Sequence, residues 1–284
     1  MSQLIKIGIS TCPNDTFAFH ALLNRKIDTG ELEFEFELLD VEELNTRLFA
    51  GDFDVAKASF HAAVSLADQL AILSSGSALG FGVGPLLLAA PHGRTPGEDF
   101  GLEGESRLPR VGCPGEHTTA TLLYKIFYPG QGKLQQMVFS DIMPRLQKRE
   151  LEFGVCIHEG RFTYRDEGLD CVADLGSLWE DRTGLPLPLG GILVRKSLGN
   201  QRMTGIQSLV RQSIEYGLAH RAETLATMKQ YAQEFSDDVL YAHVDTYVND
   251  WTLELGELGQ KSLATLAELA SGSSGVHQPF DFVE

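Results

Sequence analysis

Four short polar segments of this chain carry the hydroxyl, amide, ammonium and imidazole groups that could do chemistry. They are residues 10–16, 57–59 and 115–120, together with His158. Each follows an apolar run with the composition of a buried strand. Because open α/β sheets bind ligands at the carboxyl ends of parallel strands, we expect these segments to meet a ligand. An imidazole there can accept or donate a proton near neutral pH, so His158 is the candidate for proton transfer.

A small carboxylate is the ligand that best suits the other groups. The hydroxyls of Ser59 and Thr119 could donate hydrogen bonds to it, and backbone amides at two helix starts would face it. Lys57 ends a strand, which is less typical of a solvated charge than a position on a helix face. These positions would then come from two separate parts of the chain.

Each candidate also has a purely structural interpretation. Ser59 could simply begin a helix, Lys57 could be a solvated charge, and His158 could be a hydrogen-bonded core residue. The Glu-Gly-Arg that follows His158 favours a loop over a core position. Asn14, Asp15, Thr118 and Thr119 are residue types that cap helix starts, so each of them could have only that role.

The elements that would position these residues occur twice. Residues 47–56 and 145–154 both have the pattern of a helix end, an acidic turn and a buried strand. Residues 7–13 similarly resemble residues 111–114, and each stretch leads into a helix through a polar loop. Repeated order is a stronger signal than repeated composition, so we expect two similar α/β lobes with a cleft between them. The alternative is that any two strand–helix units look alike.

Hydrophobic periodicity predicts the individual elements. The expected strands are residues 4–9, 32–39, 53–58, 85–90, 110–113, 137–139, 153–157 and 192–195. The expected helices are residues 16–26, 41–50, 60–70, 118–127, 142–148, 200–220, 222–235, 237–249 and 255–270. Residues 91–108 are rich in Gly, Pro and charge, which indicates an exposed loop.

The length of 284 residues is large for a single core and favours two domains. We expect a discontinuous large lobe of residues 1–88 and 190–284 and a small lobe of residues 89–189. The chain would cross between them near residues 85–90 and 186–191, where extended apolar residues adjoin Gly or Pro.

Composition and charge exclude several classes of function. The net charge of −16 argues against nucleic acid, which is bound through clustered Lys and Arg. No apolar run approaches the roughly 20 residues of a membrane-spanning helix, and the N-terminus lacks the pattern of a signal peptide. The cysteines lack Cys-x-x-Cys spacing, which indicates a reducing cytoplasm and argues against a zinc site. We therefore expect a cytoplasmic protein with a small-molecule partner, and neither a nucleic acid nor a membrane.

Six segments together resemble a known family, the 1,4-dihydroxy-6-naphthoate synthases of the futalosine route to menaquinone. They are residues 10–17, 57–59, 80–86, 117–120, 158–164 and 182–190. The resemblance spans nearly the whole chain, and its most specific parts are the Cys-Pro-Asn-Asp-Thr-Phe and His-Glu-Gly-Arg-Phe-Thr-Tyr sequences. It implies an α/β, two-lobed, periplasmic-binding-protein-like (type II) fold with a two-strand hinge and an interlobe cleft. It also implies a cofactor-free lyase that converts cyclic dehypoxanthine futalosine to 1,4-dihydroxy-6-naphthoate.

The resemblance assigns roles to particular residues. By position, His158 matches the family's proposed base. The substrate-binding residues would be Lys57, Ala58, Ser59, Thr119 and Ala120, to which we add Thr118 and Asn14 from the same segments.

Two other functions stay open. Chorismate dehydratase of the same pathway shares the architecture and also acts on a carboxylate, although residues 158–164 argue against it. A solute-binding protein that does no chemistry is the second alternative, and the missing export signal argues against that.

Overall fold

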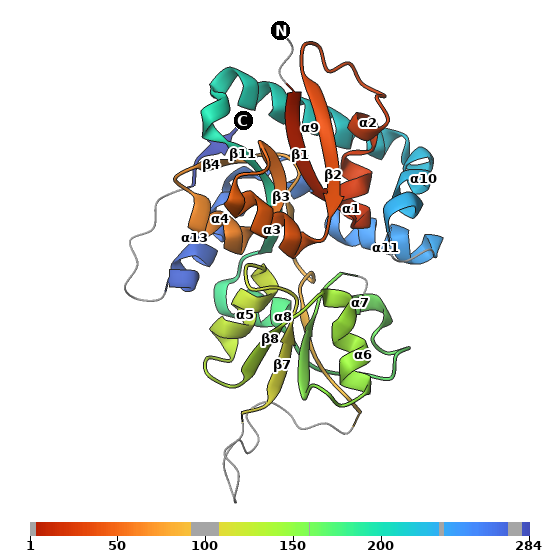
Figure 1. Ribbon diagram of the computed structural model, residues 1–284, viewed down its shortest axis with the longest axis vertical. Coiled ribbons are helices and arrows are strands. Elements are labelled where there is room, and N and C mark those ends of the chain that lie inside the picture. The colour runs from red at the N-terminus through yellow and green to blue at the C-terminus, as the bar shows by residue number, and fades with distance from the viewer. Residues whose placement is uncertain (1–3, 92–107, 159, 233–235, 272–279) are drawn as a thin grey trace, which may run out of the picture. The chain divides into compact units, whose positions relative to one another are not determined.

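The computed structural model describes residues 4–91, 108–158, 160–232, 236–271 and 280–284. The chain forms two compact units, and each contains a β-sheet with helices packed on it (Figure 1). Unit 1 consists of Met1–Gly80 and Pro188–Glu284, and unit 2 of Phe81–Leu187.

The sheet of unit 1 has seven strands within the described residues. They are β1 (Leu4–Ser10), β2 (Glu33–Leu39), β3 (Val55–Ser59), β4 (Leu70–Leu73), β5 (Ala78–Gly80), β11 (Leu187–Arg195) and β12 (Phe282–Val283). Their order is β12-β4-β11-β3-β1-β2, and β5 pairs with β11 off this path. Strand β1 is parallel to β2 and β3, whereas β11 is antiparallel to β3. The carboxyl ends of β1, β2 and β3 therefore lie at one edge of the sheet.

The helices of unit 1 come from both ends of the chain. They are α1 (Pro13–Ala18), α2 (His20–Leu23), α3 (Val41–Ala50), α4 (Phe60–Leu66), α9 (Asn200–Ala219), α10 (Arg221–Tyr231), α11 (Asp237–Tyr247), α12 (Asp250–Leu253) and α13 (Gly256–Ser271), with a 3-10 helix η2 (Lys196–Leu198). Ile5, Ile7 and Ile9 of β1 are buried in one core cluster with Ile206 and Val210 of α9. This burial of apolar area holds the C-terminal helices on the N-terminal strands.

Unit 2 is a smaller version of the same arrangement. Its strands are β6 (Leu86–Ala89), β7 (Arg110–Cys113), β8 (Lys133–Gln136), β9 (Phe153–Cys156) and β10 (Asp170–Asp174), in the order β10-β6-β9-β7-β8. Its helices are α5 (Thr119–Phe127), η1 (a 3-10 helix, Phe139–Asp141), α6 (Ile142–Gln147), α7 (Gly160–Thr163) and α8 (Leu175–Thr183). Strand β7 is parallel to β8 and β9, and β6 is antiparallel to β9. The run β11-β3-β1-β2 in unit 1 thus has the same directions as β6-β9-β7-β8 in unit 2.

The duplication extends to individual backbone contacts. The Asp54 amide donates to the Lys6 carbonyl at 3.0 Å, and the Glu152 amide donates to the Arg110 carbonyl at 3.1 Å. The carboxylates of the same two acidic residues accept from the Lys6 and Arg110 amides. A Cβ added at Gly8 would lie 3.0 Å from the Phe53 ring. The equivalent Cβ at Gly112 would lie 2.6 Å from Leu151 Cδ1. The repeated pattern in the sequence therefore corresponds to a repeated structure.

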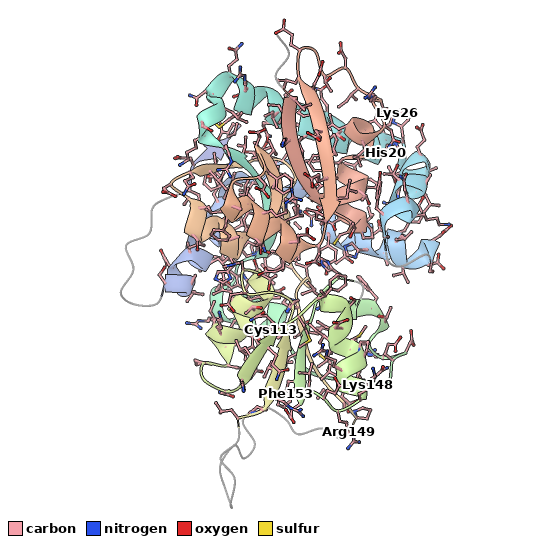
Figure 2. All side chains as sticks on the ribbon, viewed as in Figure 1. His20, Lys26, Cys113, Lys148, Arg149 and Phe153 are labelled. Atoms are coloured by element: carbon pink, nitrogen blue, oxygen red, sulfur yellow. The ribbon has the colours of Figure 1, made fainter. Side chains whose placement is uncertain are left out.

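One position of the repeat differs in a way that affects stability. The turn after α3 contains Gly51 at φ +93°, and the matching turn after α6 contains the exposed Arg149 at φ +57° (Figure 2). The left-handed conformation costs an L-residue about 1–2 kcal/mol, and a glycine loses about 0.5–1 kcal/mol more backbone entropy on folding than alanine. Replacing Arg149 by Gly should therefore raise the free energy of unfolding by about 1 kcal/mol, as measured by urea denaturation.

The matched control is Gly51→Arg, which should destabilise by a similar amount. A Cβ at Gly51 would meet only Arg195 Nη2 at 3.6 Å, so the cost there is conformational and not steric. Equal stability of the Arg149→Gly variant and the unchanged protein would contradict this account.

Several sequence-based expectations need correction. Residues 81–88 belong to unit 2 and not to the large lobe, because β6 is hydrogen-bonded between β9 and β10. The first crossing accordingly lies at Gly80–Phe81 and not at residues 85–90, whereas the return at Leu187–Pro188 lies within the predicted residues 186–191. The strand predicted at residues 137–139 is wrong, since β8 ends at Gln136 and a 3-10 helix begins at Phe139. The predicted loop at residues 91–108 falls almost entirely outside the described residues.

Of the helices predicted near the N-terminus, one is divided and another is shorter than expected. The expected helix 16–26 consists of α1 and α2, which are separated at Phe19. The expected helix 60–70 ends at Leu66, because Leu70 already pairs with β11. The sequence did not predict β4, β5, β8, β10, β12, α7, α8 or α12.

Candidate functional site

His158 lies in a strained turn just beyond the carboxyl end of β9. Its φ is +57°, a left-handed conformation that costs a residue other than Gly of order 1–3 kcal/mol. Its carbonyl accepts from the Arg161 amide at 3.2 Å, where α7 begins. The imidazole packs edge-on against Phe139, with ring centroids 4.7 Å apart. The turn therefore ends the strand and places an imidazole against an aromatic ring.

Residues 118–120 occupy the start of α5, in the loop that follows β7. The Thr118 hydroxyl accepts from the Thr121 amide at 3.2 Å and lies 2.9 Å from the Gly115 carbonyl, to which it donates. Thr118 is therefore the N-cap of α5, as its structural interpretation required. Thr119 and Ala120 are buried in the first turn. Because β7 and β9 are parallel neighbours, these residues and His158 follow strand ends at the same edge of the unit 2 sheet.

Cys113 ends β7 beside this segment (Figure 2). Burial raises the pKa of its thiol to about 12, although a hydrogen bond with Thr121 opposes the change. The thiol is therefore protonated at neutral pH and is a poor nucleophile.

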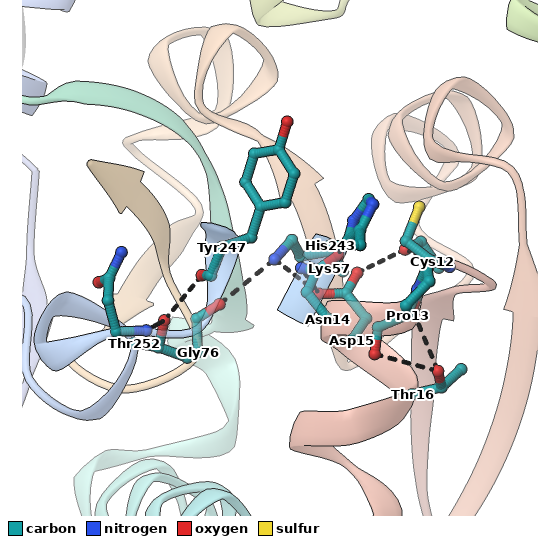
Figure 3. Close-up of polar contacts among 12 residues, drawn as sticks. Cys12, Pro13, Asn14, Asp15, Thr16, Lys57, Gly76, His243, Tyr247 and Thr252 are labelled. Carbon is teal, nitrogen blue, oxygen red and sulfur yellow. Dashed lines mark hydrogen bonds and ion pairs between the residues drawn. The ribbon is translucent and has the colours of Figure 1, made fainter. Parts of the chain in front are cut away.

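In unit 1 the central feature is a buried ion pair. Lys57 lies in β3, and its Nζ is 2.8 Å from Asp15 Oδ1 and 3.3 Å from the Gly76 carbonyl (Figure 3). Only 8% of the Lys57 side chain and 4% of the Asp15 side chain are exposed. A buried ammonium needs such a partner, because removing an ion from water costs several kcal/mol. The solvated interpretation of Lys57 is therefore wrong.

Asp15 is the most heavily bonded group of this site. Besides the bond from Lys57, its carboxylate accepts hydrogen bonds from the Ser10 hydroxyl at 2.5 Å and from the side-chain amide of Asn14 at 2.9 Å. The Asn14 side-chain oxygen in turn lies 3.0 Å from His243 Nε2 on α11 (Figure 3). Asn14 thus contacts Asp15 directly and connects it to the C-terminal helices.

Ser59 ends β3 on the same face as Lys57, since side chains alternate along a strand. Its oxygen accepts from the Asn45 side-chain amide at 3.2 Å, and its own amide donates to the Asn45 side-chain oxygen at 3.0 Å. Asn45 comes from α3. This arrangement leaves the Ser59 hydroxyl proton available to donate to a ligand.

The structure therefore groups the predicted residues by unit. Lys57, Ser59 and Asn14 lie together in unit 1, and Ala58 points to the opposite face of β3. Residues 118–120 and His158 lie in unit 2. Sequence reasoning missed Asn45, His243 and the pairing of Asp15 with Lys57. A lysine inside the apolar strand Val-Ala-Lys-Ala-Ser signals a buried partner, but only the tertiary structure identifies it.

Comparison with known proteins decides the family. Residues 5–272 match the family described as menaquinone biosynthesis. A Thermus thermophilus protein named 1,4-dihydroxy-6-naphtoate synthase is 43% identical over 264 residues, which cover 93% of each chain. The chain belongs to the menaquinone biosynthesis family. A Streptomyces coelicolor protein of the same name is 35% identical over 275 residues, covering 95% of this chain and 94% of the relative.

Solved structures place this family member among periplasmic-binding-protein-like folds, as the sequence predicted. The crystal structure of protein AF1704 from Archaeoglobus fulgidus has a TM-score of 0.85 at 31% identity and covers 94% of this chain and 97% of that one. The alkanesulfonate-binding protein SsuA from Xanthomonas axonopodis pv. citri has a TM-score of 0.64 at 12% identity, over 86% and 84% of the two chains. The second likeness shows the fold alone.

The described residues of this family member contain no group of three or more His, Cys, Asp or Glu side chains suited to a metal ion. No helix within them is long and apolar enough to cross a membrane.

Proposed function

We propose that this chain is a lyase that converts cyclic dehypoxanthine futalosine to 1,4-dihydroxy-6-naphthoate, with His158 as general base. The observation that carries the proposal is the 43% identity to the Thermus synthase over 93% of both chains. The strained His158 turn supports it, because backbone strain concentrates at functional sites.

The proposed reaction requires the protein to position the substrate and to transfer a proton. The substrate carries a carboxylate, and loss of its sugar-derived part makes the remaining skeleton aromatic, which drives the reaction. A base must remove a proton, and nearby donors must stabilise the enolate-like charge that develops. Because side chains of the protein can perform both tasks, we propose that neither a metal ion nor a redox cofactor is needed. Dialysis against EDTA, which removes metal ions, should then leave turnover unchanged.

We propose that Lys57 and Ser59 bind the anionic part of the substrate and that Thr119 and Ala120 contribute to binding from unit 2. The Lys57 ammonium has three N–H donors, and Asp15 and Gly76 accept from two of them. The third donor and the Ser59 hydroxyl are chemically suited to a carboxylate. Thr118 contributes indirectly by capping the start of α5, which carries Thr119 and Ala120. Asn14 contributes by orienting the Asp15 carboxylate.

The decisive experiment compares substrates. The purified protein is incubated in parallel with cyclic dehypoxanthine futalosine and with chorismate, and the products are identified by mass spectrometry. Formation of 1,4-dihydroxy-6-naphthoate from the first substrate alone would establish the proposal. Dehydration of chorismate would identify the chorismate dehydratase, and binding without turnover would identify a solute-binding protein.

Removal of a single hydroxyl should weaken binding without unfolding the protein. Loss of a hydrogen bond to a charged group costs roughly 1.5–3 kcal/mol, which is about 10- to 150-fold in Kd. We expect Ser59→Ala and Thr119→Val each to raise the Kd of 1,4-dihydroxy-6-naphthoate by that factor in calorimetric titrations. Thr265→Val is the control that should leave Kd unchanged, because Thr265 is a half-buried residue of α13 whose hydroxyl donates to the Lys261 carbonyl. Unchanged affinity in both test variants would remove these residues from the binding site.

We also propose a cytoplasmic location, because the reducing cytoplasm suits the four free thiols of Cys12, Cys113, Cys156 and Cys171. Cell fractionation with an antibody to this chain would test it, and recovery in an exported fraction would contradict it.

A further inference from the structure

Arg161 connects the His158 turn to the rest of unit 2. It lies three residues after His158, in the first turn of α7. Its Nη1 donates to the Gly84 carbonyl at 2.9 Å, and its Nη2 donates to the Gly82 carbonyl at 2.9 Å. Nη2 also lies 2.7 Å from Asp174 Oδ2, and 17% and 25% of the two side chains are exposed. One guanidinium thus joins three segments that are distant in sequence.

The segments that Arg161 reaches are themselves fixed. Asp174 caps α8 by accepting from the Gly176 and Ser177 amides at 2.9 and 3.2 Å. The Gly82 amide donates to Glu180 on the same helix at 2.7 Å. A Cβ at Gly84 would lie 2.7 Å from the Gly176 Cα atom, so the loop packs directly on the start of α8. Arg161 is therefore anchored on segments that are hydrogen-bonded to α8 or packed on it.

The His158 turn needs such an anchor because its own conformation is unfavourable. A left-handed residue other than Gly persists only where the surrounding structure over-determines it. The turn is held on one side by β9, and the hydrogen bond from the Arg161 amide to the His158 carbonyl ties it to α7 on the other. The Arg161 side chain then fixes α7 to α8 and to residues 82–84.

We propose that Arg161 is a positioning residue, which keeps the His158 imidazole in the position that proton transfer requires. It does so through the ion pair with Asp174 and the hydrogen bonds to the Gly82 and Gly84 carbonyls. The charge of the guanidinium is balanced by Asp174, so its role is to orient and not to bind substrate. This inference rests on the proposed role of His158 as base.

The test combines kinetics with rescue. Arg161→Ala should lower kcat roughly 10- to 100-fold with KM changed by less than about threefold, because a small displacement of a reacting group has an effect of that size. Millimolar guanidinium chloride should restore part of kcat in this variant. Arg161→Lys keeps the charge beside Asp174 but lacks the planar fork for two carbonyls, so it should also lose kcat while staying folded.

The control is Arg110→Ala. Arg110 forms a comparable ion pair with Glu152 at 2.7 Å, at the amino-terminal ends of β7 and β9, and its removal should leave kcat unchanged. Unchanged kcat in both Arg161 variants would overturn the proposal. The proposal would also fail if Arg161→Ala lowered kcat no more than Arg110→Ala does. It would fail equally if guanidinium chloride did not restore kcat in Arg161→Ala, because Arg161 would then have only a structural role.

A spectroscopic measurement separates this inference from the proposed function. The imidazole ¹⁵N signals of His158 are followed through a pH titration in the substrate-free protein. Arg161→Ala should change the chemical shifts and the titration midpoint, and Arg110→Ala should not. If the wild-type protein makes no naphthoate, the proposed function fails and the titration still decides whether Arg161 positions His158. Unaltered His158 signals in Arg161→Ala would refute the positioning role.

Discussion

Replacing His158 by Asn should lower turnover by roughly 10²–10⁴-fold while the protein stays folded. The loss has that size because a positioned base contributes that much to proton transfer. Asn is the informative substitution, since it tolerates the left-handed backbone at φ +57° better than most residues. Steady-state kinetics gives the turnover, and circular dichroism and thermal unfolding report whether the fold is retained.

Two further variants make this result specific. His158→Gly removes the imidazole and also relieves the backbone strain, so it should lose the same turnover without loss of stability. His220→Asn changes an exposed histidine that stacks on Tyr216 in unit 1, and it should keep full turnover. Near-normal turnover of His158→Asn would show that another group accepts the proton.

Breaking the buried pair of Lys57 and Asp15 should have the largest effect on stability. Removing one partner leaves an uncompensated buried charge, which costs about 3–5 kcal/mol. We expect Asp15→Asn to reach this range. Lys57→Met should cost less, because the Ser10 hydroxyl and the Asn14 amide still donate to the Asp15 carboxylate. Urea denaturation of each variant measures the change in the free energy of unfolding.

The double variant Asp15→Asn/Lys57→Met isolates the interaction between the two groups. Its destabilisation should be smaller than the sum of the two single effects by at least about 1 kcal/mol, because contacting residues couple. The exposed pair of Lys26 and Glu223, 3.1 Å apart and labelled at Lys26 in Figure 2, is the matched control. That pair should show little coupling, since solvent screens exposed charges. Additive effects at Lys57 and Asp15 would contradict a stabilising pair.

The repeat suggests why a lysine stands at position 57. Residues 47–56 of unit 1 align with residues 145–154 of unit 2. When this alignment is continued along the strand, Val155 is the residue equivalent to Lys57. Val155 is fully buried, so the fold at this position accepts an apolar side chain. The ion pair is therefore an addition to unit 1 that the shared architecture does not require, and this supports a functional role for Lys57.

Local patterns in the sequence were sufficient to predict most of the individual elements and their repetition. Helix α3 and strand β7 have the bounds that periodicity predicted, and β1, α5 and β9 differ by one residue at one end. These elements are set by burial alternation and by short-range caps, such as Asp40 at the start of α3 and Thr118 at the start of α5. The polar segments after strand ends followed from the same local patterns.

Contacts between residues far apart in the chain could not be predicted from these local patterns and follow from the three-dimensional fold. Residues 86–89 read as a buried strand in the sequence, but their hydrogen bonds to β9 and β10 are what assign them to unit 2. Asp15 is 42 residues from Lys57, and His243 is 229 residues from Asn14. Arg161 reaches carbonyls 77 and 79 residues away. Such pairings depend on strand order and helix packing, which a local pattern of residue types does not specify, because many carboxylates and carbonyls could satisfy the same cation.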